Sequence, residues 1–167
     1  SNPLGFRNQG EQWLIIKENE VKYGQFKNIR STINKAIGYW EDRNVKTIQY
    51  ADFEDFFNSL KISNKSKSNA RSILHTFWKW MLRRKVIKHD QFPEFPEISY
   101  ELNFRKTISK EDQERIIDEI SRISSKENTK IWLGIKMLST YISIRPNELI
   151  SIQEKHIDLK NGLILIP

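Results

Sequence analysis

Apolar residues recur with a helical period in the first part of the chain. One stripe runs between residues 25 and 43, and another lies between Lys61 and Lys88. The members are Phe26, Ile29, Ile33, Ala36, Ile37 and Trp40 in the first stripe and Ala70, Ile73, Leu74, Phe77, Trp78 and Met81 in the second. Spacings of three and four residues predict two helices that each bury one face.

Two further segments differ in how clearly their pattern predicts a helix. A short helix is predicted by Phe53, Phe56, Phe57 and Leu60, and the carboxylates at its start suit the positive end of a helix dipole. Residues 4–23 contain apolar side chains, but their weak period leaves both a helix and an extended segment open.

The second half of the chain carries clear helix-start signals. Ser109 is a predicted N-cap with Asp112 at the third helical position, and Pro146 suits the first position of a later helix. Between them, the apolar residues from 131 to 142 predict a helix buried on much of its surface. Asn161-Gly162 then favours a tight hairpin turn before an apolar run, so we expect a strand or one arm of a hairpin.

Two prolines divide the chain. Pro93 and Pro96 fall within residues 89–97, where each fixes φ and restricts the preceding residue, so no helix is expected there. We predict a helical domain over residues 1–98, a linker over residues 99–108 and a partial α+β domain over residues 109–167. The fold class is therefore mainly α, with a short β hairpin or strand at the end.

Charge is unevenly distributed between these parts. The net charge is +7; residues 1–98 carry 17 basic and 11 acidic side chains, whereas residues 107–167 carry nine of each. Lys61 to Lys88 alone holds nine basic residues and no Asp or Glu. Such an uncompensated field favours a polyanionic partner for the first domain.

Double-stranded DNA is the partner that this pattern favours. Lysine and arginine release counterions from the phosphate backbone, and short polar side chains bind phosphate oxygens. The candidate contacts are Lys65, Lys67, Ser68, Asn69, Arg71 and His75 at the head of the second basic helix, Lys27, Asn28, Arg30 and Ser31 on the earlier helix, and Lys106 in the linker. Two alternatives remain open: a solvated helix face without a ligand, and an acidic membrane surface.

Several chemistries find no support in the composition. The chain has no cysteine and three scattered histidines, so we expect no disulfide, metal site or small-molecule cofactor. No apolar run approaches the roughly 20 residues that span a bilayer. We therefore expect a cytoplasmic protein.

One short box gives the chain a family resemblance. A basic helical domain, a proline-containing linker and the sequence Arg145-Pro146-Asn147-Glu148-Leu149 together resemble the tyrosine recombinases of the phage-integrase family. The resemblance implies a bacterial, phage or mobile-element context. It also implies a SAM-like core-binding domain that clamps DNA together with a catalytic domain, and assembly as an oligomer on DNA.

The resemblance assigns roles to two residues of the box. Arg145 matches the first catalytic arginine, which binds the scissile phosphate, and Glu148 matches the acidic residue that orients it. A guanidinium suits that role because its fork stays charged and offers parallel donors to phosphoryl oxygens. An ordinary ion pair at a helix start is the other interpretation of these two residues.

The chain also departs from the family pattern. Ile142 and Ser143 stand where the family usually has Thr-Gly, and no tyrosine follows Arg145. We expect the remaining catalytic residues, including the tyrosine nucleophile, to lie beyond Pro167, so this chain should bind DNA without cutting it. A non-enzymatic helical DNA-binding or accessory protein is the alternative function.

Overall fold

The chain divides into two units, Ser1–Leu102 and Asn103–Pro167. The computed structural model describes residues 2–101, 106–141 and 143–167, so part of the predicted linker and Ile142 lie outside the described residues. Helix predominates in both units, and the sheet in the described residues is one antiparallel strand pair near the C-terminal end. The prediction of a mainly α chain ending in a hairpin is confirmed at this level.

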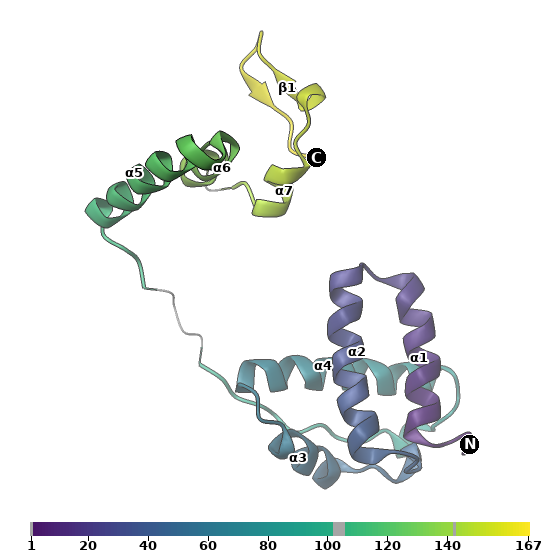
Figure 1. The fold of residues 1–167 in the computed structure, drawn as a ribbon. Helices are drawn as coiled ribbons and strands as arrows, with labels where there is room; N and C mark the ends of the chain where they lie inside the picture. Colours follow the sequence, from purple (N-terminus) through teal and green to yellow (C-terminus); the bar gives the residue numbers. More distant parts are fainter. Residues whose placement is uncertain (1, 102–105, 142) are drawn as a thin grey trace. The chain divides into compact units, whose positions relative to one another are not determined.

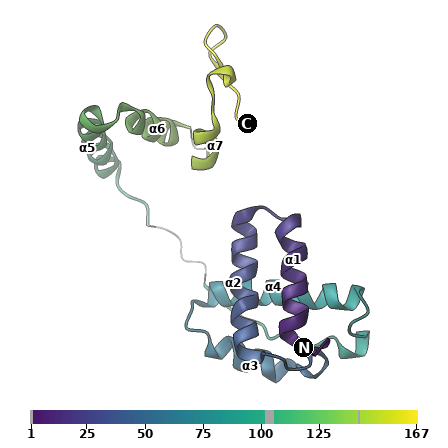
Figure 2. The same cartoon turned by 45° about the vertical axis from the view of Figure 1, so that its right-hand side comes forward.

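The N-terminal unit is built on an antiparallel helix pair. Its elements are α1 (Phe6–Glu20), α2 (Tyr23–Trp40), η1 (Val45–Thr47), α3 (Tyr50–Ser59), α4 (Asn64–Arg83) and η2 (His89–Gln91). Both views show α1 beside α2 with α4 crossing the pair (Figures 1 and 2). The segment that the sequence left open thus forms α1, and both predicted stripes form helices.

Aromatic rings fill the centre of this unit. The ring of Trp40 lies 5.0 Å from Phe6, 5.3 Å from Phe53 and 4.8 Å from Phe56, measured between centroids. Trp78 on α4 is fully buried and lies 5.0 Å from Phe53. The apolar stripes of α2 and α4 therefore meet in one core, which confirms the burial predicted for both helices.

Gly10 allows α1 and α2 to pack closely. A Cβ atom at this position would lie 3.1 Å from Cγ2 of Ile33 and 3.3 Å from Cδ1 of Ile37. These distances are shorter than ordinary van der Waals contact, so the neighbouring isoleucines occupy space that a side chain would need.

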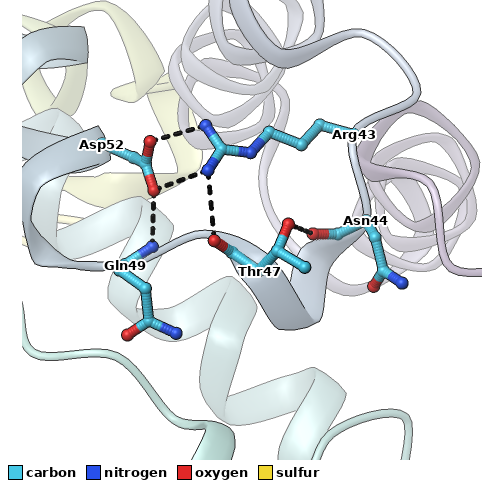
Figure 3. A network of polar contacts seen from close by, with 5 residues as sticks. All are labelled: Arg43, Asn44, Thr47, Gln49 and Asp52. Carbon is cyan, nitrogen blue, oxygen red and sulfur yellow. Dashed lines mark hydrogen bonds and ion pairs between the residues drawn. The ribbon is translucent and has the colours of Figure 1, made fainter.

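A polar network fixes the connection between α2 and α3 (Figure 3). Arg43 donates to both carboxylate oxygens of Asp52, at 2.5 and 2.9 Å, and to the carbonyl of Thr47 at 3.1 Å. The same carboxylate accepts the backbone N–H of Gln49 at 2.8 Å, which caps the start of α3. Burial alone would raise the pKa of Asp52, but these hydrogen bonds outweigh burial and hold the pKa below its usual value.

Helix α4 ends earlier than the sequence suggests. The basic stretch that carries the predicted helix runs to Lys88, whereas the helix stops at Arg83. Lys85 adopts a left-handed φ of 59°, and Val86 donates its N–H to the carbonyl of Met81 at 3.0 Å. This reversal satisfies the last carbonyls of the helix, and Ile87 is buried beyond it.

The C-terminal unit begins with the predicted caps. Its elements are α5 (Lys110–Glu127), α6 (Thr129–Thr140), α7 (Pro146–Ser151), η3 (Glu154–His156), β1 (Ile157–Asp158) and β2 (Leu163–Ile164). The Ser109 hydroxyl accepts the N–H of Asp112 at 3.0 Å, and Pro146 stands in the first turn of α7. Both helix starts are confirmed.

Burial in the C-terminal unit differs from the prediction. Helix α6 was expected to be buried on much of its surface, but Ile131 is 52% exposed and Leu133 is 59% exposed. Among the described residues of this unit, only Ser124 is buried. The helical period shows which face is apolar, but the elements present do not cover that face.

The terminal hairpin has a longer loop than a two-residue turn. Asp158 pairs with Leu163, so four residues, 159–162, connect the strands. The Asp158 carboxylate accepts the N–H groups of Lys160 and Asn161, and Gly162 supplies a positive φ of 65°. In the described part of the chain, no helix is both long and apolar enough to cross a membrane.

Candidate nucleic-acid interface

A groove of about 700 Å³ lies between α1, α2 and α4. We call it the α2–α4 groove. Its apolar lining is Trp13, Val21, Ile29, Phe56, Leu60, Ile62, Ala70 and Ile73, and its polar lining is Lys17, Gln25, Asn28, Ser31, Thr32, Lys35, Ser66, Asn69, Ser72 and Thr76. No Asp or Glu belongs to this lining among the described residues. The groove thus offers donors and cations without a carboxylate that would repel an anion.

The donors of the groove come from two helices. Asn28 and Ser31 lie on α2, one turn apart, and Asn69 lies on α4. All three are exposed, and their side chains make no hydrogen bond to another described residue. Three residues that the sequence nominated for DNA binding are therefore brought together by the fold.

The two lysines of the groove differ in their partners. Lys17 forms an ion pair with Glu20, with 2.5 Å between Nζ and Oε2, and lies 5.7 Å from the Trp13 ring. Lys35 is exposed and has no ion pair within the described residues. Lys35 is consequently the stronger candidate for an anion contact, because its charge is not already compensated.

Other nominated residues of α4 lie away from the groove. Arg71 donates from Nε to the carbonyl of Pro96 at 2.7 Å and from Nη2 to the carbonyl of Phe95 at 3.3 Å. The His75 ring lies edge-on to Phe92 and Phe95, with centroids 5.6 and 5.2 Å apart. These contacts hold residues 92–100, which we call the strap segment, against α4.

Burial first, and then the charges of Lys79 and Arg71, hold the pKa of His75 below its usual value. A histidine with a lowered pKa is neutral at physiological pH and adds no positive charge to the surface. Lys65 also reaches the strap segment, where its Nζ donates to the Tyr100 hydroxyl at 3.2 Å.

The remaining nominated residues are scattered. Lys27 is exposed on α2, and the Arg30 guanidinium lies 5.6 Å from the ring centre of Phe26. Lys67 and Ser68 are half-buried on α4. Lys106 is exposed and belongs to the C-terminal unit. Of the nominated residues, Asn28, Ser31 and Asn69 therefore line the groove, and the others do not.

Sequence reasoning missed several residues of the groove. Thr32 stands four residues after Asn28, Lys35 stands four residues after Ser31, and Thr76 follows Asn69 by two turns. This polar spacing is present in the sequence, but clusters of positive charge point to Lys65, Lys67 and Arg71 instead.

Arg145 and Glu148 form a pair in the C-terminal unit. The backbone N–H of Arg145 donates to Glu148 Oε2 at 2.8 Å, and its Nη1 donates to Oε1 at 2.9 Å. These bonds, the backbone one first, hold the pKa of Glu148 below its usual value. Within the described residues, Nε and Nη2 of Arg145 have no partner and the side chain is 81% exposed, so two donors face solvent.

Metal-binding geometry is not found in the described residues, which contain no group of three or more His, Asp or Glu side chains placed to hold an ion. Comparisons with protein-family models, curated proteins and solved structures find no match for this chain.

Proposed function

We propose that the N-terminal unit binds double-stranded DNA and that the α2–α4 groove receives the sugar-phosphate backbone of one strand. The observation that carries this proposal is the convergence of Asn28, Ser31, Lys35 and Asn69 on one groove without a carboxylate. Neutral amide and hydroxyl donors bind phosphate oxygens, while a lysine adds a charge-assisted contact. The basic excess of residues 1–98 supplies the long-range attraction.

We further propose that the chain is part of a tyrosine recombinase, with the N-terminal unit as its SAM-like core-binding domain. In this proposal the two solvent-facing donors of Arg145 bind the scissile phosphate, and Glu148 holds the guanidinium from the other side. The tyrosine hydroxyl loses its proton and its oxygen bonds to phosphorus while the P–O bond to the leaving sugar oxygen breaks. The leaving oxygen takes up a proton and departs as a hydroxyl, which leaves a 3′-phosphotyrosyl link. The proposed partner is duplex DNA bound by an oligomer of the protein.

A second function is favoured by one specific observation. Glu148 caps the start of α7 by accepting the backbone N–H of Arg145 and also pairs with its guanidinium, which accounts for both residues without any catalytic role. A non-enzymatic DNA-binding or accessory protein would need only the N-terminal groove. The reading frame after Pro167 separates the two functions: a His-x-x-Arg box followed by a tyrosine supports the recombinase, and a stop codon contradicts it.

The DNA proposal is tested by duplex binding as a function of salt. Lys35→Ala removes one lysine from the groove, so we expect weaker binding and a salt slope smaller by about 0.9 on logarithmic axes. Lys46→Ala is the matched control, because it removes the same charge from the same unit outside the groove. Fluorescence anisotropy with a labelled mixed-sequence duplex measures both.

Asn69→Ala completes the design, since it removes a donor without changing the charge. We expect it to weaken binding and leave the salt slope unchanged. Equal losses in the Lys35 and Lys46 variants would show that net charge rather than the groove governs binding. A wild-type chain that fails to bind duplex DNA at low salt would overturn the proposal.

A further inference from the structure

The strap segment is held on α4 by two sets of contacts that differ in burial. The first set, which we call the inner anchor, comprises the two hydrogen bonds from Arg71 and the packing of Phe95. Phe95 is 9% exposed, and its ring centroid lies 4.3 Å from that of Phe53 in the core. Opening the inner anchor would therefore expose part of the core of the N-terminal unit.

The second set is exposed, and we call it the outer tether. Asn64 donates from Nδ2 to the carbonyl of Ser99 at 3.0 Å, and Lys65 donates from Nζ to the Tyr100 hydroxyl at 3.2 Å. The Lys65 ammonium also lies 4.6 Å from the centre of the Tyr100 ring, within the range of a cation–π contact. Tyr100 remains 39% exposed, so the outer tether can open without disturbing the core.

The outer tether engages Lys65, a cation that the sequence nominates for DNA binding and that directly precedes Ser66 of the α2–α4 groove on α4. The Lys65 ammonium cannot remain centred on the Tyr100 ring and also lie against a phosphate. An exposed cation–π contact is weak, whereas a phosphate offers the ammonium a full opposite charge and releases a condensed counterion. DNA therefore has the advantage in a competition for Lys65.

We propose that the contact between Lys65 and Tyr100 is a tether that DNA opens. When a phosphate captures Lys65, Tyr100 loses its contact with α4, while the hydrogen bond from Asn64 to Ser99 and the inner anchor at Phe95 and Arg71 stay closed. DNA binding at the N-terminal unit thereby releases the Tyr100 end of the strap segment from α4. This inference rests on the proposed DNA binding and adds that the contact between Lys65 and Tyr100 competes with DNA for Lys65.

The expected size of the effect follows from the strength of the contact. Removing a competing contact of about 0.5–1 kcal/mol should tighten DNA binding by about two- to fivefold. Tyr100→Ala in the full chain removes both the ring and the hydroxyl, so we expect this gain in affinity. Tyr100→Phe keeps the ring and loses the hydrogen bond, and its gain should be smaller.

A double-mutant cycle ties the gain to Lys65. In a Lys65→Ala background, Tyr100→Ala should change DNA affinity no further, because the tether is already absent. Affinity is measured by anisotropy with the same mixed-sequence duplex. Unchanged or weaker binding by Tyr100→Ala, or an equal gain in both backgrounds, would overturn the tether.

A structural readout separates this inference from the proposed function. In the free chain, the Tyr100 ring should shift the NMR signals of the Lys65 ε-methylene group upfield, and Tyr100→Ala should abolish that shift. Adding duplex DNA should abolish it in the wild type as well. A wild type that binds no DNA would contradict the proposed function. A wild type that binds DNA and keeps the ring-current shift would contradict the Lys65–Tyr100 tether alone.

Discussion

The two units of this chain use apolar residues in opposite ways. In the N-terminal unit, Phe6, Phe53, Phe77 and Trp78 are all fully buried. In the C-terminal unit, Ile150 is 80% exposed, and Ser124 is the buried residue among those described. Since burial of apolar surface is the main favourable term in folding, stability should be concentrated in the first unit.

The largest loss of stability is expected from a substitution in the core of the N-terminal unit. Trp78→Ala removes a fully buried ring, so we expect it to lower the free energy of unfolding of the N-terminal unit by about 3–5 kcal/mol. Ile131→Ala, at a position 52% exposed in the C-terminal unit, should cost less than about 1 kcal/mol. Hydrogen exchange reports the two units separately, through the amides of α4 and α6.

The same experiment tests the wild type. Amides of α4 should exchange far more slowly than those of α6, because exchange from a core helix requires extensive opening. Equal protection in the two helices would show that the C-terminal unit has a source of stability beyond its own packing.

A smaller effect is expected at the polar connection of the N-terminal unit. Asp52→Asn weakens the Arg43 pair and the cap of α3, and we expect a loss of about 1 kcal/mol at neutral pH. Because the pKa of Asp52 is lowered in the folded chain, its stabilisation is present above the ordinary carboxyl pKa and disappears as pH falls through the lowered value.

Urea unfolding across a pH series measures this difference. The wild type and Asp52→Asn should converge in stability in acid. Asp55→Asn, in the same helix but exposed, should match the wild type throughout. A constant gap between the wild type and Asp52→Asn at every pH would mean that the ion pair contributes nothing to the acid sensitivity.

The smallest effect is expected at the start of α7. Glu148→Gln keeps the shape of the capping side chain and removes the charge beside Arg145, so exchange of the α7 amides should become faster by a few-fold at most. Glu148→Ala should have a larger effect because it also removes the acceptor. If neither substitution alters exchange, the Glu148 cap does not stabilise α7.

Much of the fold was predictable because its signals are local. The stripe from Phe26 to Trp40, the cap at Ser109 and the first-turn proline at Pro146 each depend on residues within a few positions of one another. The exposure of Ile131 was not predictable in this way. A helical period identifies an apolar face, but only the tertiary structure shows whether another element covers it.

The candidate site was predictable only in part, because the sequence does not show which side chains are engaged by another segment of the chain. Asn69 and Arg71 are two residues apart and were assigned to one surface, yet they lie on different faces of α4. Arg71 is engaged by the carbonyls of residues 95 and 96, in a segment where Pro93 and Pro96 exclude a helix. Its proposed contact with DNA stays a prediction, and its established partners lie within the chain.

Gly10 has a consequence for how this protein can vary. The α2–α4 groove is walled by α1 through Trp13 and Lys17, and α1 takes its place because a hydrogen atom, and not a methyl group, faces Ile33 and Ile37. Any larger residue at position 10 would push the wall outward or force both isoleucines to yield. The width of the groove thus depends on Gly10, which does not line it. Substitution at position 10 is limited by the distance between α1 and α2 and not by any contact with a ligand.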